Sequence, residues 1–170
     1  MREGSQVTRC HCFPHHGHYS VGEHSFNMGL LLEVLYPSDF LGNEKARLQR
    51  AILYHDLHER WTGDSPAAIK RLFPLLKATD ASVFIKKETG IGMPVLNGYQ
   101  TDWLKALDNI EFLLWCDDQI ALGSKVAEAK RIEVMDWIDA NQDSIPSECM
   151  DFLNKYGASG GWRRTPDDLS

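Results

Sequence analysis

Apolar residues recur along the chain at the three- and four-residue spacing of α-helices, and capping residues precede several of these runs. The first predicted helix runs from Ser20 to about Tyr36, just before Pro37. Ser20 and Glu23 fit a capping box, in which the two side chains satisfy free backbone N–H groups of the first turn. Alternating runs of β-branched residues bounded by turns are missing. The pattern therefore predicts an all-α bundle.

Six further helices are predicted along the rest of the chain. The second begins near Asn43, continues toward Glu59 and ends before the turn at Thr62-Gly63. The third begins at Asp64-Ser65, with a proline in the first turn, where a missing N–H costs nothing. The others are expected over residues 75–88, 100–122, 124–140 and 147–156. In the helix over 100–122 an apolar stripe predicts a buried face, made of Trp103, Leu104, Leu107, Ile110 and Leu114.

Length and composition are those of one globular domain. A chain of 170 residues can bury a core without the help of disulfides. Its 43% hydrophobic and 25% charged residues exclude wholesale disorder. No internal repeat or low-complexity tract divides the chain, and its end is rich in Gly and Ser. We therefore predict a single domain over residues 1–160 and a mobile tail over 161–170.

Charge and hydropathy narrow the classes of partner. The net charge of -6 and the pI near 5.6 argue against long DNA or RNA, whereas a small phosphorylated molecule needs only a metal and a few basic side chains. No apolar run is long enough to span a membrane. The N-terminus lacks the apolar middle of a secretory signal, so we expect a cytoplasmic protein with reduced cysteines. Cys116 and Cys149 are interpreted as small apolar fillers of helices.

The dipeptide His55-Asp56, near the end of an apolar helix, is the most informative chemical feature. A neutral imidazole beside a carboxylate can bind Zn, Mn, Co or Fe. His24, early in the first helix, and Asp108, among core positions of the fifth, are further candidate ligands. Taken one by one, such a histidine is more often a hydrogen-bonded residue, and such an aspartate a solvated one.

The order of these residues resembles a known ligand set. His, then His-Asp, then Asp on successive helices is the ligand set of the HD superfamily of metal-dependent phosphohydrolases. Residues 21–25 (Val-Gly-Glu-His-Ser) and 54–66 (Tyr-His-Asp-Leu-His-Glu-Arg-Trp-Thr-Gly-Asp-Ser-Pro) are similar to motifs of bacterial 5'-deoxynucleotidases and small phage dATP triphosphohydrolases. The resemblance covers roughly residues 9–123. It implies an HD-domain helical bundle with one divalent metal ion, of Co, Mn, Zn, Fe or Mg, held by His24, His55, Asp56 and Asp108.

The resemblance also implies roles for other residues. The metal and Asp56 belong to the hydrolytic step, in which a metal-bound water becomes available as hydroxide. Glu59, one turn further on the same helix face, matches the residue that orients this water, unless it is an ordinary surface carboxylate. Arg9 stands where these families have a phosphate-clamping arginine. Lys70 is a second candidate for the phosphate, or a surface lysine, and Asp64 binds the sugar 3'-hydroxyl or caps a helix.

The chain departs from the pattern in three respects. Cys10 replaces a tryptophan that crowds the ribose 2'-hydroxyl in the bacterial nucleotidases, which makes a preference for deoxyribose less secure. Residues 10–18 are rich in His and Cys, and form either a separate zinc site or a substrate-facing loop in which Phe13 or a histidine stacks on a base. The spacing of the ligands is short, as in the phage enzymes.

These features favour a hydrolase that removes the 5'-phosphate or phosphates from a deoxynucleotide, such as a dNMP, dATP or another dNTP. An alarmone hydrolase or phosphodiesterase of the same superfamily is the nearest alternative. From another class, a catalytically silent HD module would bind nucleotide and metal without releasing phosphate. The resemblance further implies a homo-oligomer, which a monomer mass in light scattering would reject.

Overall fold

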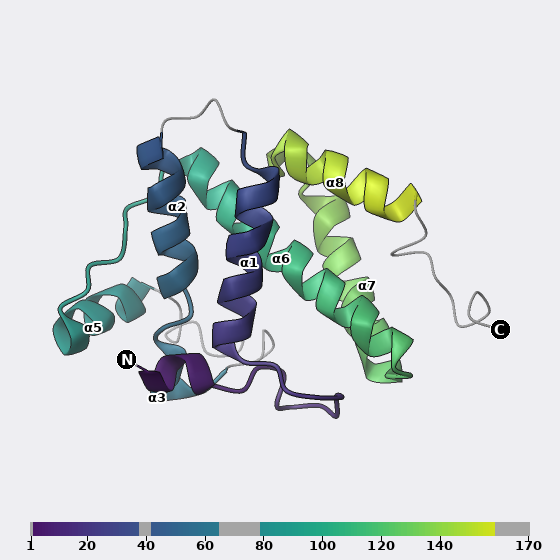
Figure 1. Ribbon diagram of the computed structural model, residues 1–170, viewed down its shortest axis with the longest axis horizontal. Coiled ribbons are helices and arrows are strands. Elements are labelled where there is room, and N and C mark those ends of the chain that lie inside the picture. The colour runs from purple at the N-terminus through teal and green to yellow at the C-terminus, as the bar shows by residue number, and fades with distance from the viewer. Residues whose placement is uncertain (1, 38–41, 65–78, 159–170) are drawn as a thin grey trace.

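The computed structural model describes residues 2–37, 42–64 and 79–158, and most of these are helical. Beyond an isolated antiparallel bridge between Thr8 and Ser20, the described residues form no strand, which confirms the all-α prediction. Figure 1 shows the helices, which are η1 (Arg2–Gln6), α1 (Val21–Leu35), α2 (Gly42–Tyr54), α3 (Glu59–Thr62), α5 (Thr79–Thr89), α6 (Gly98–Ala121), α7 (Lys125–Ala140), η3 (Gln142–Ser144) and α8 (Ser147–Ala158). None of the helices in this part of the chain has the length and apolarity needed to cross a membrane.

Helix α6 is the centre of the arrangement. It contacts α1, α2, α7 and α8, while α1 and α2 run side by side in opposite directions (Figure 1). The short helices η1 and α3 contact each other at the end of the bundle where α1 begins and α2 ends. Four segments that carry candidate site residues therefore meet at this end: the chain after η1, the start of α1, the end of α2 and the middle of α6.

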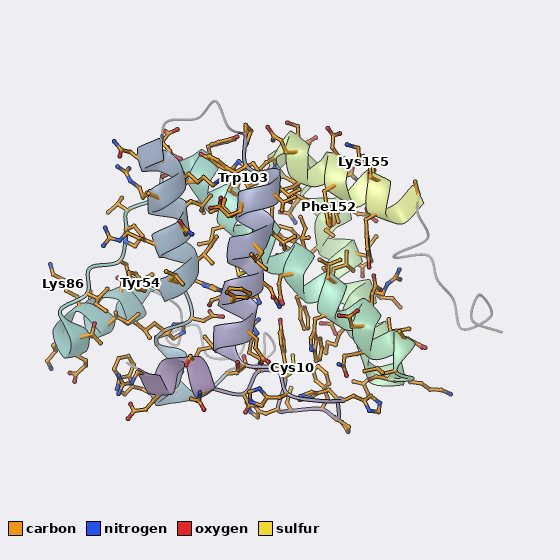
Figure 2. The ribbon with its side chains drawn as sticks, viewed as in Figure 1. Cys10, Tyr54, Lys86, Trp103, Phe152 and Lys155 are labelled. Carbon is orange, nitrogen blue, oxygen red and sulfur yellow. The ribbon has the colours of Figure 1, made fainter. Side chains whose placement is uncertain are left out.

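The core joins α1, α2, α6, α7 and α8 in one apolar cluster. Trp103, Leu107 and Ile110 are buried, and Leu104 and Leu114 pack against the cluster, so the predicted stripe of this helix is confirmed. Trp103 lies near the upper end of α1 in Figure 2, far from Cys10 at the lower end. Cys116 and Cys149 are fully buried, as expected of apolar fillers.

Helix α1 begins as its sequence predicts. The Ser20 side chain accepts a hydrogen bond from the Glu23 backbone N–H, and the Glu23 side chain accepts one from the Ser20 N–H at 2.7 Å. The helix ends at Leu35, with Tyr36 as its C-cap. Gly22 lies so close to η1 that a Cβ atom there would be 2.8 Å from the Cβ of Ser5. The glycine therefore allows η1 to pack against the first turn of α1.

The prediction that the second helix continues to Glu59 was wrong. Helix α2 ends at Tyr54, and a turn follows in which the Leu57 N–H donates to Tyr54 O and the Glu59 N–H to Asp56 O. Both bonds join the N–H of residue i+3 to the carbonyl oxygen of residue i, the pattern of a 3₁₀-helix, which winds more tightly than an α-helix. The ring of His55 contributes to the end of α2. Its Nδ1 lies 2.7 Å from Ile52 O, which in a continuous α-helix would accept a hydrogen bond from the backbone N–H of Asp56.

The remaining boundaries agree with the sequence within a few residues. Helix α6 begins at Gly98 behind an Asn97 capping box, Ser124 caps α7, and α8 extends to Ala158. The start predicted for a helix at residue 75, the helix expected from Asp64-Ser65 and the tail over 161–170 lie outside the described residues.

Candidate metal centre

Three candidate ligands converge at the end of the bundle where α1 begins. His24 is in the first turn of α1, His55 is in the turn after α2, and Asp108 is in the middle of α6. One ligand atom from each lies within 4.8 Å of the other two, and the described residues hold no other such group. The rings of His24 and His55 are 5.4 Å apart. Residues far apart in the sequence thus form a compact set of two nitrogens and one oxygen.

The two imidazoles present free nitrogens to this set. Each ring has its Nδ1 engaged: that of His24 lies 2.5 Å from Glu111 Oε2, and that of His55 lies 2.7 Å from Ile52 O. Both Nε2 atoms are buried and make no hydrogen bond of suitable geometry among the described residues, although Asp108 Oδ1 lies 3.0 Å from that of His24 and Asp56 Oδ2 lies 3.2 Å from that of His55. Buried polar atoms without partners are costly. A divalent ion bound by both Nε2 atoms and Asp108 would remove this cost, so the residues present fit a metal.

Asp56 lies beside this group rather than within it. Its Oδ2 is 3.2 Å from His55 Nε2 and accepts a hydrogen bond of 2.5 Å from the Arg9 guanidinium. Both side chains of this ion pair are only 13% exposed. The role of Asp56 as the fourth ligand therefore stays a prediction, and Arg9 is its partner in the described structure.

Arg9 is held at the centre by the backbone as well as by charge. Its N–H donates to Tyr19 O at 2.8 Å, next to the bridge between Thr8 and Ser20, and its guanidinium lies over the Tyr19 ring. Burial alone would lower the pKa of Arg9, but the Asp56 carboxylate, with Asp108 and Glu59, raises it. A permanently charged guanidinium therefore lies next to the three-ligand set.

The charges of the centre perturb one another strongly. Burial lowers the pKa of His55, but the Asp56 carboxylate outweighs it and the net effect is a rise to about 9. For His24, the neighbouring Asp108 and Glu111 carboxylates likewise outweigh burial and raise the pKa. Burial of Asp56 and partial burial of Asp108 would raise their pKa values, but the adjacent histidines hold both below the usual range. The carboxylates are therefore ionised and ready to bind a cation.

Sequence reasoning missed a buried carboxylate next to the ligands. Glu111 follows Asp108 by one turn of α6 and accepts hydrogen bonds from the Tyr19 hydroxyl at 2.5 Å and from Asn27 Nδ2 at 3.2 Å. Its side chain is only 4% exposed. The signal that could have revealed it is an acidic residue between Ile110 and Phe112, in a stretch that is otherwise apolar.

The other predicted site residues are placed differently. Glu59 is buried at the first position of α3, a helix separate from α2, and its charge acts on Arg9. The Asp64 carboxylate accepts a hydrogen bond of 2.7 Å from the Cys10 N–H. Cys10 itself is buried, with a positive φ of 57°. Lys70 lies outside the described residues.

The segment of residues 10–18 packs along α6. Phe13 and His15 lie against Trp115, with ring centroids 6.2 and 5.6 Å from it. The buried Gln119 side chain accepts from the His16 N–H and donates to His16 O, which fastens the segment to the helix. Its side chains contribute nothing to the ligand group found among the described residues. The expected stacking of Phe13 on a base stays a prediction.

Comparison with known protein families gives a match to part of the chain. The family model described as HD domain matches residues 6–89, a segment that includes Arg9, His24, His55 and Asp56. It ends before α6, which supplies Asp108 and Glu111. No curated protein matches the chain.

Proposed function

We propose that this chain, which carries an HD domain over residues 6–89, hydrolyses the phosphate ester or anhydride of a small nucleotide with a divalent metal. HD-domain proteins are mostly metal-dependent hydrolases. The observation that carries the proposal is the meeting of two free imidazole nitrogens and a carboxylate beside an arginine whose side chain is 13% exposed. A cation-binding set next to a phosphate-binding guanidinium is what metal-assisted phosphoryl chemistry requires.

Each residue of the centre has a definite task in this mechanism. His24, His55 and Asp108, with Asp56 as the expected fourth ligand, would hold the ion, which lowers the pKa of a bound water and polarises the phosphoryl oxygen when present. Arg9 binds the remaining phosphate oxygens through its fork of N–H donors and offsets the charge that develops on them. Glu59, buried near Arg9, takes the proton of the attacking water.

A deoxynucleotide is the preferred substrate class. The net charge of -6 favours a mononucleotide over a polymer. Support for the deoxy sugar comes from the similarity of residues 21–25 and 54–66 to the motifs of deoxynucleotidases and dATP triphosphohydrolases. In this proposal Asp64, whose carboxylate holds the Cys10 backbone, lies at the sugar end of the substrate.

A nucleotide screen tests the proposal. The purified chain is incubated with each dNMP, dNTP and ribonucleotide in the presence of Co²⁺, Mn²⁺, Mg²⁺ or Zn²⁺, and the nucleoside and inorganic phosphate products are separated by chromatography. We expect cleavage of deoxynucleotides, and a loss of at least about a hundredfold in rate for Asp56→Ala and His55→Ala. The inorganic product, monophosphate or triphosphate, identifies the bond that is broken.

The matched control is Asp118→Asn, which removes an exposed carboxylate from the same helix as Asp108. It should cleave at the wild-type rate. If the chain binds a nucleotide with metal but releases no product, it is a silent binding module and the proposal is wrong. Cleavage of a cyclic dinucleotide or of an alarmone, without cleavage of any deoxynucleotide, would instead favour those branches of the superfamily.

A further inference from the structure

Glu111 occupies a position that the proposed hydrolysis does not use. Its carboxylate is buried behind His24, on the side of the imidazole away from Asp108 and His55. One oxygen, Oε2, lies 2.5 Å from both His24 Nδ1 and the Tyr19 hydroxyl. The other, Oε1, accepts a hydrogen bond from Asn27 Nδ2 at 3.2 Å. Both oxygens of the carboxylate are thus held in place.

The hydrogen bonds fix which nitrogen of His24 carries the proton. The Tyr19 hydroxyl donates a hydrogen bond to Glu111 Oε2 at 2.5 Å, so the carboxylate is the acceptor in that contact. A carboxylate has no proton to offer in return. The proton between His24 Nδ1 and Glu111 Oε2 must therefore come from the imidazole. A neutral His24 with its proton on Nδ1 has a lone pair on Nε2, which lies 3.0 Å from Asp108 Oδ1.

The surroundings keep this arrangement rigid. The Tyr19 ring stacks on Trp115 with centroids 4.6 Å apart and meets the His24 ring edge-on at 6.1 Å. His24 and Tyr19 are buried, with exposed fractions of 0% and 2%. The Nδ1 side of the His24 ring faces Glu111 Oε2 at 2.5 Å and the Tyr19 hydroxyl at 3.2 Å.

We propose that Glu111 is the positioning residue of the metal centre, which holds His24 in the Nδ1–H tautomer and aims its Nε2 at the metal. Metal-binding histidines in proteins generally donate their second N–H to such an acceptor, which sets the ring orientation and makes the ligand more basic. The inference shares the metal centre with the proposed function, but it concerns metal binding rather than the substrate.

Cobalt binding tests the role without any measurement of catalysis. Wild type, Glu111→Gln and Glu111→Leu are titrated with Co²⁺, whose absorption bands report the ligands, and the dissociation constants are compared. Glu111→Leu removes the acceptor and should weaken binding roughly 10- to 100-fold. Glu111→Gln keeps an acceptor oxygen but loses the charge, so it should weaken binding less, by about 5-fold. Asp118→Asn removes a carboxylate elsewhere on α6 and should bind Co²⁺ as wild type does.

A second readout reports the tautomer directly. In the Zn²⁺-loaded wild-type protein, ¹⁵N NMR of the His24 ring should show the proton on Nδ1, and Glu111→Gln should keep it there. This measurement also decides the question if Glu111→Leu does not fold. A proton on Nε2 of His24, or wild-type Co²⁺ affinity in folded Glu111→Leu, would overturn the inference. If wild type binds neither Co²⁺ nor Zn²⁺, the inference and the proposed function both fail. If wild type binds them and only the Glu111 results disagree, the inference alone fails, so the two failures are distinguishable.

Discussion

At the scale of the residue, the centre depends on which atom of each side chain is already engaged. His24 and His55 use Nδ1 for hydrogen bonds within the protein and leave Nε2 buried without one among the described residues. Asp56 is bound by Arg9, whereas Asp108 has a side chain that is 41% exposed. The centre therefore combines preformed nitrogen ligands with one carboxylate that is open to solvent.

The cysteines give a prediction at this scale. Burial raises the pKa of the Cys10 thiol to about 12, so at pH 8 it is almost entirely protonated and unreactive, because the thiolate is the nucleophile. Cys116 and Cys149 are buried too, whereas Cys12 is exposed. A thiol reagent at pH 8 should therefore label one of the four cysteines in the folded chain and all four after unfolding.

The control for thiol labelling is Cys12→Ser, which should leave the folded chain unlabelled. Peptide mapping by mass spectrometry identifies the modified residue. Rapid labelling of Cys10 in the folded protein would show that its thiol is accessible, contrary to its exposed fraction of 8%.

At the scale of the element, short-range signals determined where helices start. Capping boxes form at the starts of α1 and α6, between Ser20 and Glu23 and between Asn97 and Gln100. Each depends only on two residues within one turn of each other. The end of α2 was not visible in the sequence. It depends on a histidine ring and on the packing of η1 and α3 at that end of the bundle.

The capping box of α1 gives a prediction with a pH dependence. Ser20→Ala should lower the free energy of unfolding by about 1 kcal/mol at pH 7, because it removes a cap of the first turn. Burial raises the pKa of Glu23, but the hydrogen bonds from Ser20, together with the contact with His18, outweigh it and lower the pKa below its usual 4.5. The stabilisation from Glu23 is therefore present above pH 4.5 and is lost as the pH falls through its lowered pKa.

Urea unfolding of wild type and Glu23→Gln at a series of pH values measures this dependence. The difference in stability should shrink as the medium becomes acidic. Glu88→Gln removes an exposed carboxylate near the end of α5 and serves as the control, with no comparable change. A difference between wild type and Glu23→Gln that stays constant down to pH 2 would contradict the role of the carboxylate.

At the scale of the whole molecule, one core holds the site segments in place. The buried face of α6 packs against α1 and α2, which carry His24 and lead to His55. Beyond the core, the Arg131 guanidinium on α7 donates to Asp117 Oδ1 at 2.6 Å, and the Tyr156 hydroxyl on α8 donates to Asp117 Oδ2 at 3.0 Å. The metal centre is thus supported by packing that extends over the bundle.

The core gives a prediction at this scale. Leu107 is fully buried in α6, so Leu107→Ala should lower the free energy of unfolding by about 2–5 kcal/mol through lost apolar burial and the cavity that remains. Leu122, just after the same helix, is 59% exposed, and Leu122→Ala should cost less than about 0.5 kcal/mol. Urea denaturation followed by circular dichroism measures both, and equal losses for the two variants would argue against this core.

The sequence by itself determined the helical class and most helix boundaries, because periodicity and caps are local properties, and its resemblance to HD motifs singled out His24, His55 and Asp108. Only the tertiary structure decided how these residues are used. It ended α2 before His55, paired Asp56 with Arg9 and placed Glu111 behind His24, although the two are 87 positions apart. Such contacts depend on where helices cross, and crossing is determined by packing of the whole core, which no short stretch of sequence encodes.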